Sequence, residues 1–175
     1  MAIASRSIAA LTSALAFLAA GAMAEDRVSL ADPASVANTL RLEGYRAKIH
    51  AQETGAPAIL SGSGGSAFDI QFVGCEGYNA CRGLLFTARF DLDGGIDLER
   101  INSWNSERYV GRAFVTRDCD PVIDHYVAIT PEISSSEFVT LVETWSLTLK
   151  DFRAFVGFDD NGPHFVAKCQ MTDTI

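Results

Sequence analysis

Two cysteines, Cys75 and Cys81, are the residues whose type and spacing point most directly to chemistry. On both sides of them apolar residues alternate with polar ones: Phe68, Ile70 and Phe72 before, and Leu84, Phe86, Ala88 and Phe90 after. A hairpin that sets the two cysteines opposite each other makes Phe72 face Leu84. A slip of one residue would instead send the two apolar sets to opposite faces of the sheet. The spacing therefore predicts a disulfide between two paired strands.

Cys119 and Cys169 are the other two cysteines, which either pair with each other or stay as free thiols. Zinc would need clustered cysteine or histidine ligands, and the C-x5-C spacing has no partner pair beside it. Redox-active pairs favour C-x-x-C at the start of a helix, so a bridge between strands does not fit that role. We therefore expect structural disulfides and no metal.

The other groups that could do chemistry are dispersed along the chain. His50, His125 and His164 form no H-x-x-x-H or E-x-x-H pattern, and no G-x-S-x-G presents a nucleophilic serine. His125 lies among apolar residues of a predicted strand. A hydrogen-bonded core histidine is the usual case there, and a catalytic role is the alternative. The sequence thus predicts no catalytic residue and no cofactor, and hence a protein that is not an enzyme.

Asn102, Trp104 and Asn105 form an unusual cluster, because asparagine is a poor former of helix interiors and these residues lie in a predicted helix that Asp97 caps. The three residues either contact a partner, or hydrogen-bond neighbouring strand ends and close the helix against the sheet. A further hypothesis is a small-ligand pocket, and hence a ligand-binding protein or an enzyme, in which His125, Asn102 and Asn105 converge.

The elements that would position these groups follow in the order helix, three or four strands, helix, two strands, long helix. Asp32 and Pro33 open the first helix, and Gly44 ends it. Period-2 patterns predict strands at 45–52, from 58 onward, at 68–72, 84–90, 109–116 and 122–129. The glycine-rich stretch at 61–66 is expected to be a turn, since it lacks the pattern of a phosphate-binding loop. This order predicts an α+β fold, in which helices pack on an antiparallel sheet.

The last helix has the clearest sequence pattern. Ser134 and Glu137 form a capping box, and Gly157 ends the helix. Apolar residues then recur at spacings of three and four, at Phe138, Val142, Trp145, Leu149, Phe152 and Val156. A stripe of this length must cover the sheet or a second subunit, since left exposed it would cause association.

Residues 1–24 have the features of a signal peptide. Arg6 precedes an apolar run, and Ala22-Met23-Ala24 is a small-x-small cleavage site. We expect cleavage after Ala24, a periplasmic or secreted protein, and no membrane span in the mature chain. The net charge of −8 makes nucleic acid a poor candidate partner.

The chain resembles the YbjN family of bacterial sensory transduction regulators. Three features carry the likeness: Ile101-Asn102-x-Trp104-Asn105, then Gly111-Arg112-Ala113, then the aromatic helix through Trp145 and Phe152. The resemblance implies a fold like that of type III secretion chaperones, in which three helices flank an antiparallel sheet. It also implies a protein that is often dimeric and has no catalytic residues. The expected domain spans 25–158, and a tail spans 159–175. The signal peptide and the Cys75–Cys81 pair depart from the cytoplasmic members.

We therefore expect an exported, non-enzymatic binding or regulatory module that contacts an unidentified protein partner or forms a homodimer.

Overall fold

The computed structural model describes residues 26–77, 80–129 and 133–158. The expected signal peptide and tail, including Cys169 and His164, lie outside these residues. The elements in chain order are β1 (Arg27–Val28), α1 (Pro33–Leu42), β2 (Lys48–Ala51), β3 (Pro57–Ser63), β4 (Ser66–Val73), β5 (Gly83–Arg89), α2 (Leu98–Glu107), β6 (Arg112–Val115), β7 (Pro121–Ala128), β8 (Ile133–Ser134) and α3 (Ser135–Phe155).

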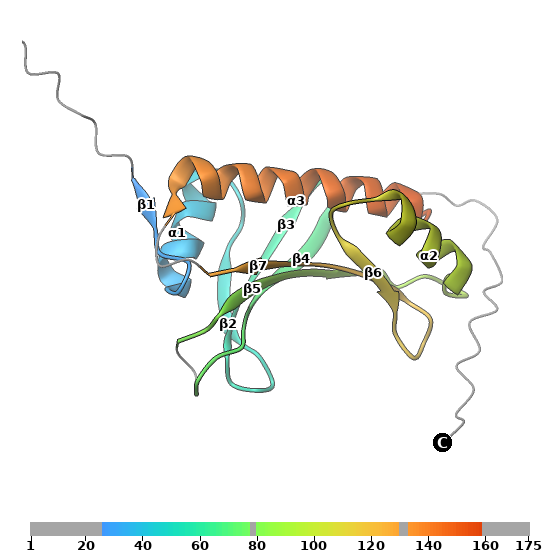
Figure 1. Cartoon of the computed structure of the whole chain (residues 1–175), viewed down its shortest axis with the longest axis horizontal. Coiled ribbons are helices and arrows are strands. Elements are labelled where there is room, and N and C mark those ends of the chain that lie inside the picture. Colours follow the sequence, from blue (N-terminus) through green and yellow to red (C-terminus); the bar gives the residue numbers. More distant parts are fainter. Residues whose placement is uncertain (1–25, 78–79, 130–132, 159–175) are drawn as a thin grey trace, which may run out of the picture.

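The six longer strands form one antiparallel sheet in the order β2-β3-β4-β5-β7-β6, and β1 pairs with β8 in a small second sheet. The three helices lie on one side of the large sheet, with α3 running along it (Figure 1). The predicted α+β class is therefore confirmed.

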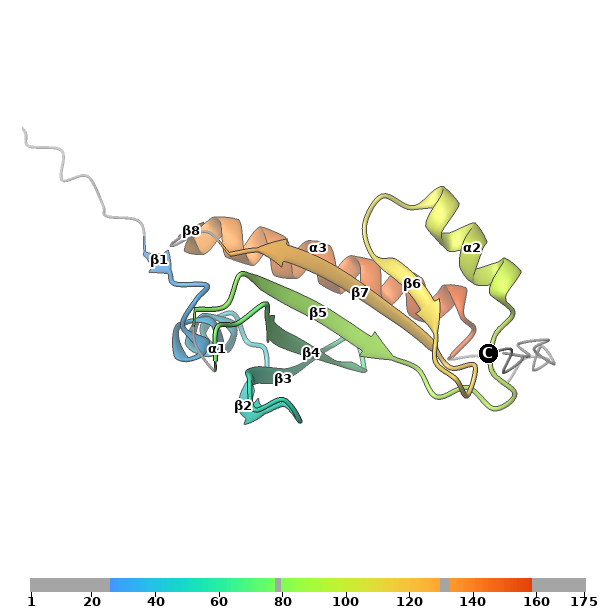
Figure 2. The same ribbon diagram turned by 60° about the horizontal axis from the view of Figure 1, so that its bottom comes forward.

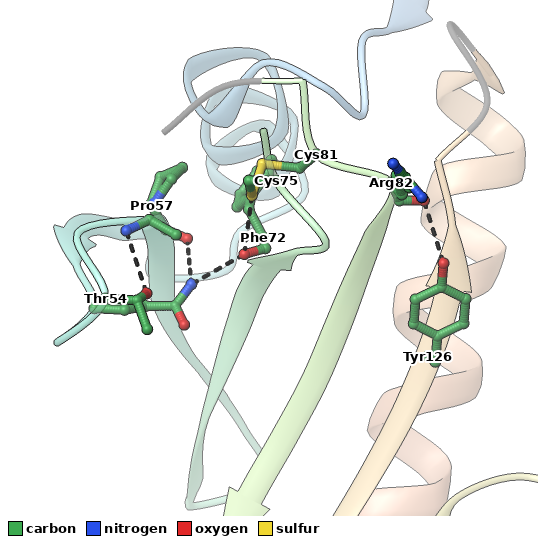
Figure 3. Close-up of a disulfide and its surroundings, with 9 residues drawn as sticks. Thr54, Pro57, Phe72, Cys75, Cys81, Arg82 and Tyr126 are labelled. Atoms are coloured by element: carbon green, nitrogen blue, oxygen red, sulfur yellow. Dashed lines mark hydrogen bonds between the residues drawn. A yellow bond between two sulfur atoms is a disulfide. The ribbon is translucent and has the colours of Figure 1, made fainter. Parts of the chain in front are cut away.

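The central hairpin has the predicted register. In the β4–β5 pair Phe72 lies opposite Leu84, and Asp69 lies opposite Thr87. Cys75 and Cys81 form the expected disulfide, just beyond the last ladder pair (Figure 3). The bridge therefore closes the loop between the strands.

Helix α3 forms the centre of the core. Ser134 caps it with the predicted capping box, and the buried residues of the helix are Phe138, Val142, Trp145, Leu149 and Phe152. The Trp145 ring lies 5.9 Å from Phe68 and 5.7 Å from Phe86, measured between centroids. The apolar stripe thus covers the sheet of its own chain, and the second-subunit alternative is not needed to bury it.

The glycine-rich stretch differs from the prediction. Ser61, Gly62 and Ser63 continue β3 and pair with β4, so the turn is only Gly64-Gly65. Both glycines have positive φ, +56° and +80°, which suits a two-residue hairpin turn. Ladder pairing with β4 has overridden the weak strand preference of glycine.

Candidate functional site

One face of the large sheet is turned away from the helices. In Figure 2 this face comes forward, and the strands lie in front of α3. Ile59, Ile70 and Phe86 are fully buried in one register row, so the alternate rows point to the other side. Those rows contain Leu60, Asp69, Gln71, Val73, Leu85, Thr87, Arg112, Phe114, Asp124 and Tyr126, which we call the open face.

Large apolar side chains remain accessible on the open face. Leu60 is 43% exposed, Phe114 40% and Tyr126 54%. The Tyr126 ring lies across Gly83, where an added Cβ would come within 2.1 Å of the ring. Its hydroxyl donates to the carbonyl of Arg82 at 3.3 Å (Figure 3). Glycine at 83 thus lets an aromatic side chain lie flat at this end of the face.

Charged pairs stand beside these apolar groups. The Arg112 guanidinium donates to both carboxylate oxygens of Asp124, which is 5% exposed. Hydrogen bonding to that carboxylate raises the pKa of Arg112 above its ordinary value. His50 contacts Asp69 at 2.9 Å, with both side chains more than a third exposed. The open face therefore mixes apolar groups with fixed charges.

The predicted Asn102–Trp104–Asn105 cluster lies in α2, beside the edge strand β6. The Asn105 amide donates to the carbonyl of Ala113 and accepts from its N–H, both at 2.9 Å. Trp104 is 2% exposed and donates to the carbonyl of Gly111 at 3.0 Å. Both side chains thus bind the outer side of the β6 segment, and Asn102 remains exposed. Partner contact by these residues stays a prediction, and Asn102 is the one whose side chain has no part in this packing.

The hypothesised pocket is present only in part. An open hollow of about 710 Å³ is lined by Asn105, His125, Tyr109, Tyr126 and Arg108, among others, and Asn102 is not in its wall. Desolvation by burial lowers the pKa of His125 below its ordinary value, against the opposing charge of Asp124. The amide of Asn105 is already engaged by Ala113. The hollow therefore brings a partly buried histidine beside Arg108, Tyr109 and Tyr126, and it lacks Asn102, one of the three side chains of the hypothesised pocket.

Two further points concern possible metal ligands and the state of Cys119. Across the described residues, no cluster of three or more His, Cys, Asp or Glu side chains could hold a metal ion. Cys119 is not a free thiol. Because Cys169 lies outside the described ranges, its pairing with Cys119 stays a prediction.

Sequence reasoning missed the ion pairs of the open face. His50 and Asp69 come together only because β2 and β4 both pair with β3. Arg112 meets Asp124 across the β6–β7 pair. The available signal was the strand pattern itself, since opposite charges at matching positions would have indicated both pairs once the strand order was known.

Comparison with known proteins gives one match. A family model named YbjN, described as "Putative bacterial sensory transduction regulator", matches residues 32–158. No curated protein and no solved structure matches the chain. Within the described part of the chain, none of the helices is long and apolar enough to cross a membrane. The expected likeness to the fold of type III secretion chaperones stays a prediction, because no solved structure matches the chain.

Proposed function

The chain belongs to the YbjN family, and we propose that it is an exported, non-enzymatic regulatory module that binds another protein through its open face. The observation that carries this proposal is the sheet face left bare by all three helices. Leu60, Phe114 and Tyr126 are each at least 40% exposed on that face. Such side chains have no role in packing the core of this chain.

The composition of the open face favours a transient contact with a different protein over an obligate homodimer. Interfaces of permanent homodimers are more apolar than the rest of the surface, whereas non-obligate interfaces are about as polar as the surface. Tyrosine and arginine dominate the energetics of many contacts between proteins. The open face carries Tyr126 beside Arg112 and the buried Asp124.

Export is supported by the cysteines. Disulfides persist in oxidising compartments and are rare in the cytosol. The Cys75–Cys81 bridge therefore fits the signal-peptide features of residues 1–24, and a partner would be sought in the same compartment.

Co-purification from the native cell envelope with matched variants tests the proposal. Phe114→Glu with Tyr126→Glu places two charges on the open face. Leu147→Glu alters a more accessible apolar residue, 65% exposed, on α3 instead. We expect the wild type and Leu147→Glu to recover the same protein in near-stoichiometric amount, and the double variant to lose it. Circular dichroism checks that each variant folds.

Two results would argue against the proposal: recovery by the double variant equal to that by wild type, or recovery of no stoichiometric partner by the wild type. Sedimentation of the purified protein at micromolar concentration tests whether the open face instead forms a homodimer. A dimer that dissociates only in the double variant would show that the open face binds a second copy, contrary to the proposal.

A further inference from the structure

A second surface site lies at the β2 edge of the sheet, opposite the β6 edge. Here β2 is shorter than its neighbour β3. The β2–β3 pairing ends at Lys48 opposite Leu60, although β3 continues to Ser63. Before Lys48 the chain turns away towards α1, since the N–H of Tyr45 donates to the carbonyl of Leu40 at 2.9 Å. The gap is a hollow of about 990 Å³ between residues 44–48 and 60–67, which we call the notch.

The charge of the notch is opposite to that of the chain. The sequence carries a net charge of −8, yet the charged side chains lining the notch are all cations: Arg41, Arg46 and Lys48. Among the described residues, neither Arg46 nor Lys48 has an ion-pair or hydrogen-bond partner for its side chain. Uncompensated cations concentrated in one hollow of an acidic protein create a local field that attracts anions.

The backbone that carries Arg46 and Lys48 is tied to α1. The Arg41 guanidinium donates to the carbonyl of Ala47 at 2.7 Å and to the side chain of Asn38 at 2.9 Å. On the other side Arg153 donates to the carbonyl of Gly65 at 3.1 Å and fixes the hairpin tip. A wall fixed before binding lowers the ordering cost of the ligand.

We propose that the notch binds a small organic anion, whose carboxylate or phosphate group contacts Arg46 and Lys48 and whose apolar body lies against Tyr45. This site goes beyond the proposed function and does not depend on it. Arginine and lysine supply charge-assisted hydrogen bonds to either head group. The volume of the notch is within the range of small-molecule pockets.

The test is a titration of ¹⁵N-labelled protein, residues 25–175, at low ionic strength. The probes are 3-phenylpropanoate and phenyl phosphate, with neutral 3-phenylpropanamide as the control. We expect saturable shifts of the amide signals of residues 46–48 and 61–66 with at least one anion, and none with the amide. The responding anion identifies the head group.

Two charge-reversal variants make the result specific. Arg46→Glu with Lys48→Glu should weaken binding about tenfold or more, because two charge-assisted contacts are replaced by repulsion. Arg117→Glu with Lys150→Glu changes the net charge equally at two exposed positions outside the notch and should bind like wild type. The proposal is overturned if neither anion gives saturable shifts, if the neutral amide binds equally well, or if both double variants bind with the same affinity. The partner experiment uses other residues, so the two can fail separately.

Discussion

The Asn105 side chain satisfies the hydrogen-bonding groups of a backbone segment at the edge of the sheet. Strand β6 has a neighbour on one side only, so the N–H and carbonyl of Ala113 on the other side need partners. The Asn105 amide supplies both a donor and an acceptor, as a neighbouring strand would. The edge of the sheet at this position is therefore closed to pairing with another chain.

Asn105→Ala should destabilise the protein by about 1–2 kcal/mol, because two partly buried hydrogen bonds between its side-chain amide and the Ala113 backbone are lost. Asn102→Ala is the matched control in the same helix. Its effect should lie within about 0.5 kcal/mol, because Asn102 is exposed like Asn105 but does not bind the Ala113 backbone. Urea unfolding followed by circular dichroism measures both. Equal losses of unfolding free energy for the two substitutions would show that the hydrogen bonds to Ala113 do not stabilise the protein.

The sequence could not decide the role of this cluster. It left a partner contact and an internal hydrogen bond open for Asn102, Trp104 and Asn105. The choice depends on where β6 lies relative to α2, and the helical pattern carries no information about that distance. The predicted helix itself, with Asp97 as its N-cap, is confirmed.

At the scale of elements, local signals were the most reliable guide. The capping box of α3 is present as predicted: the N–H of Glu137 donates to the Ser134 hydroxyl at 3.2 Å, and the N–H of Ser134 donates to the Glu137 carboxylate at 2.9 Å. Both groups lie within one turn of each other, so four residues of sequence, 134–137, contain the whole interaction. The extent of β3 was less predictable, because pairing with β4 decides it.

The capping box makes the stability of α3 depend on pH. Hydrogen bonds from the backbone and side chain of Ser134 lower the pKa of Glu137 below its ordinary value of 4.5. A carboxyl whose folded pKa is lowered contributes stability above its unfolded pKa, and that contribution is lost as pH falls through the folded pKa.

Glu137→Gln should therefore lower the melting temperature at pH 7, and the difference from wild type should shrink as pH falls below 4.5. Glutamine can still accept the hydrogen bond from Ser134, so the variant isolates the charge. Glu143→Gln, at an exposed position of the same helix, serves as the control. Thermal melts at stepped pH provide the measurement, and a difference that stays constant with pH would contradict this role of the carboxylate.

At the scale of the whole molecule, the α+β class and the β4–β5 register followed from the sequence. The register was predictable because the apolar alternation of both strands and the Cys75–Cys81 spacing require the same alignment. The placement of β7 between β5 and β6 was not predictable, since it depends on pairing between segments separated by α2. For the same reason the open face, with its ion pairs and exposed aromatic residues, could not be outlined in advance.

The proposed function places the protein outside the cytosol, with its central hairpin bridged by Cys75 and Cys81. Mass analysis of the protein isolated from its native cells, with non-reducing peptide mapping, tests this most directly. We predict a mature chain that begins at Glu25 and a peptide in which Cys75 is linked to Cys81. A chain that retains residues 1–24 and carries Cys75 and Cys81 as free thiols would contradict the account.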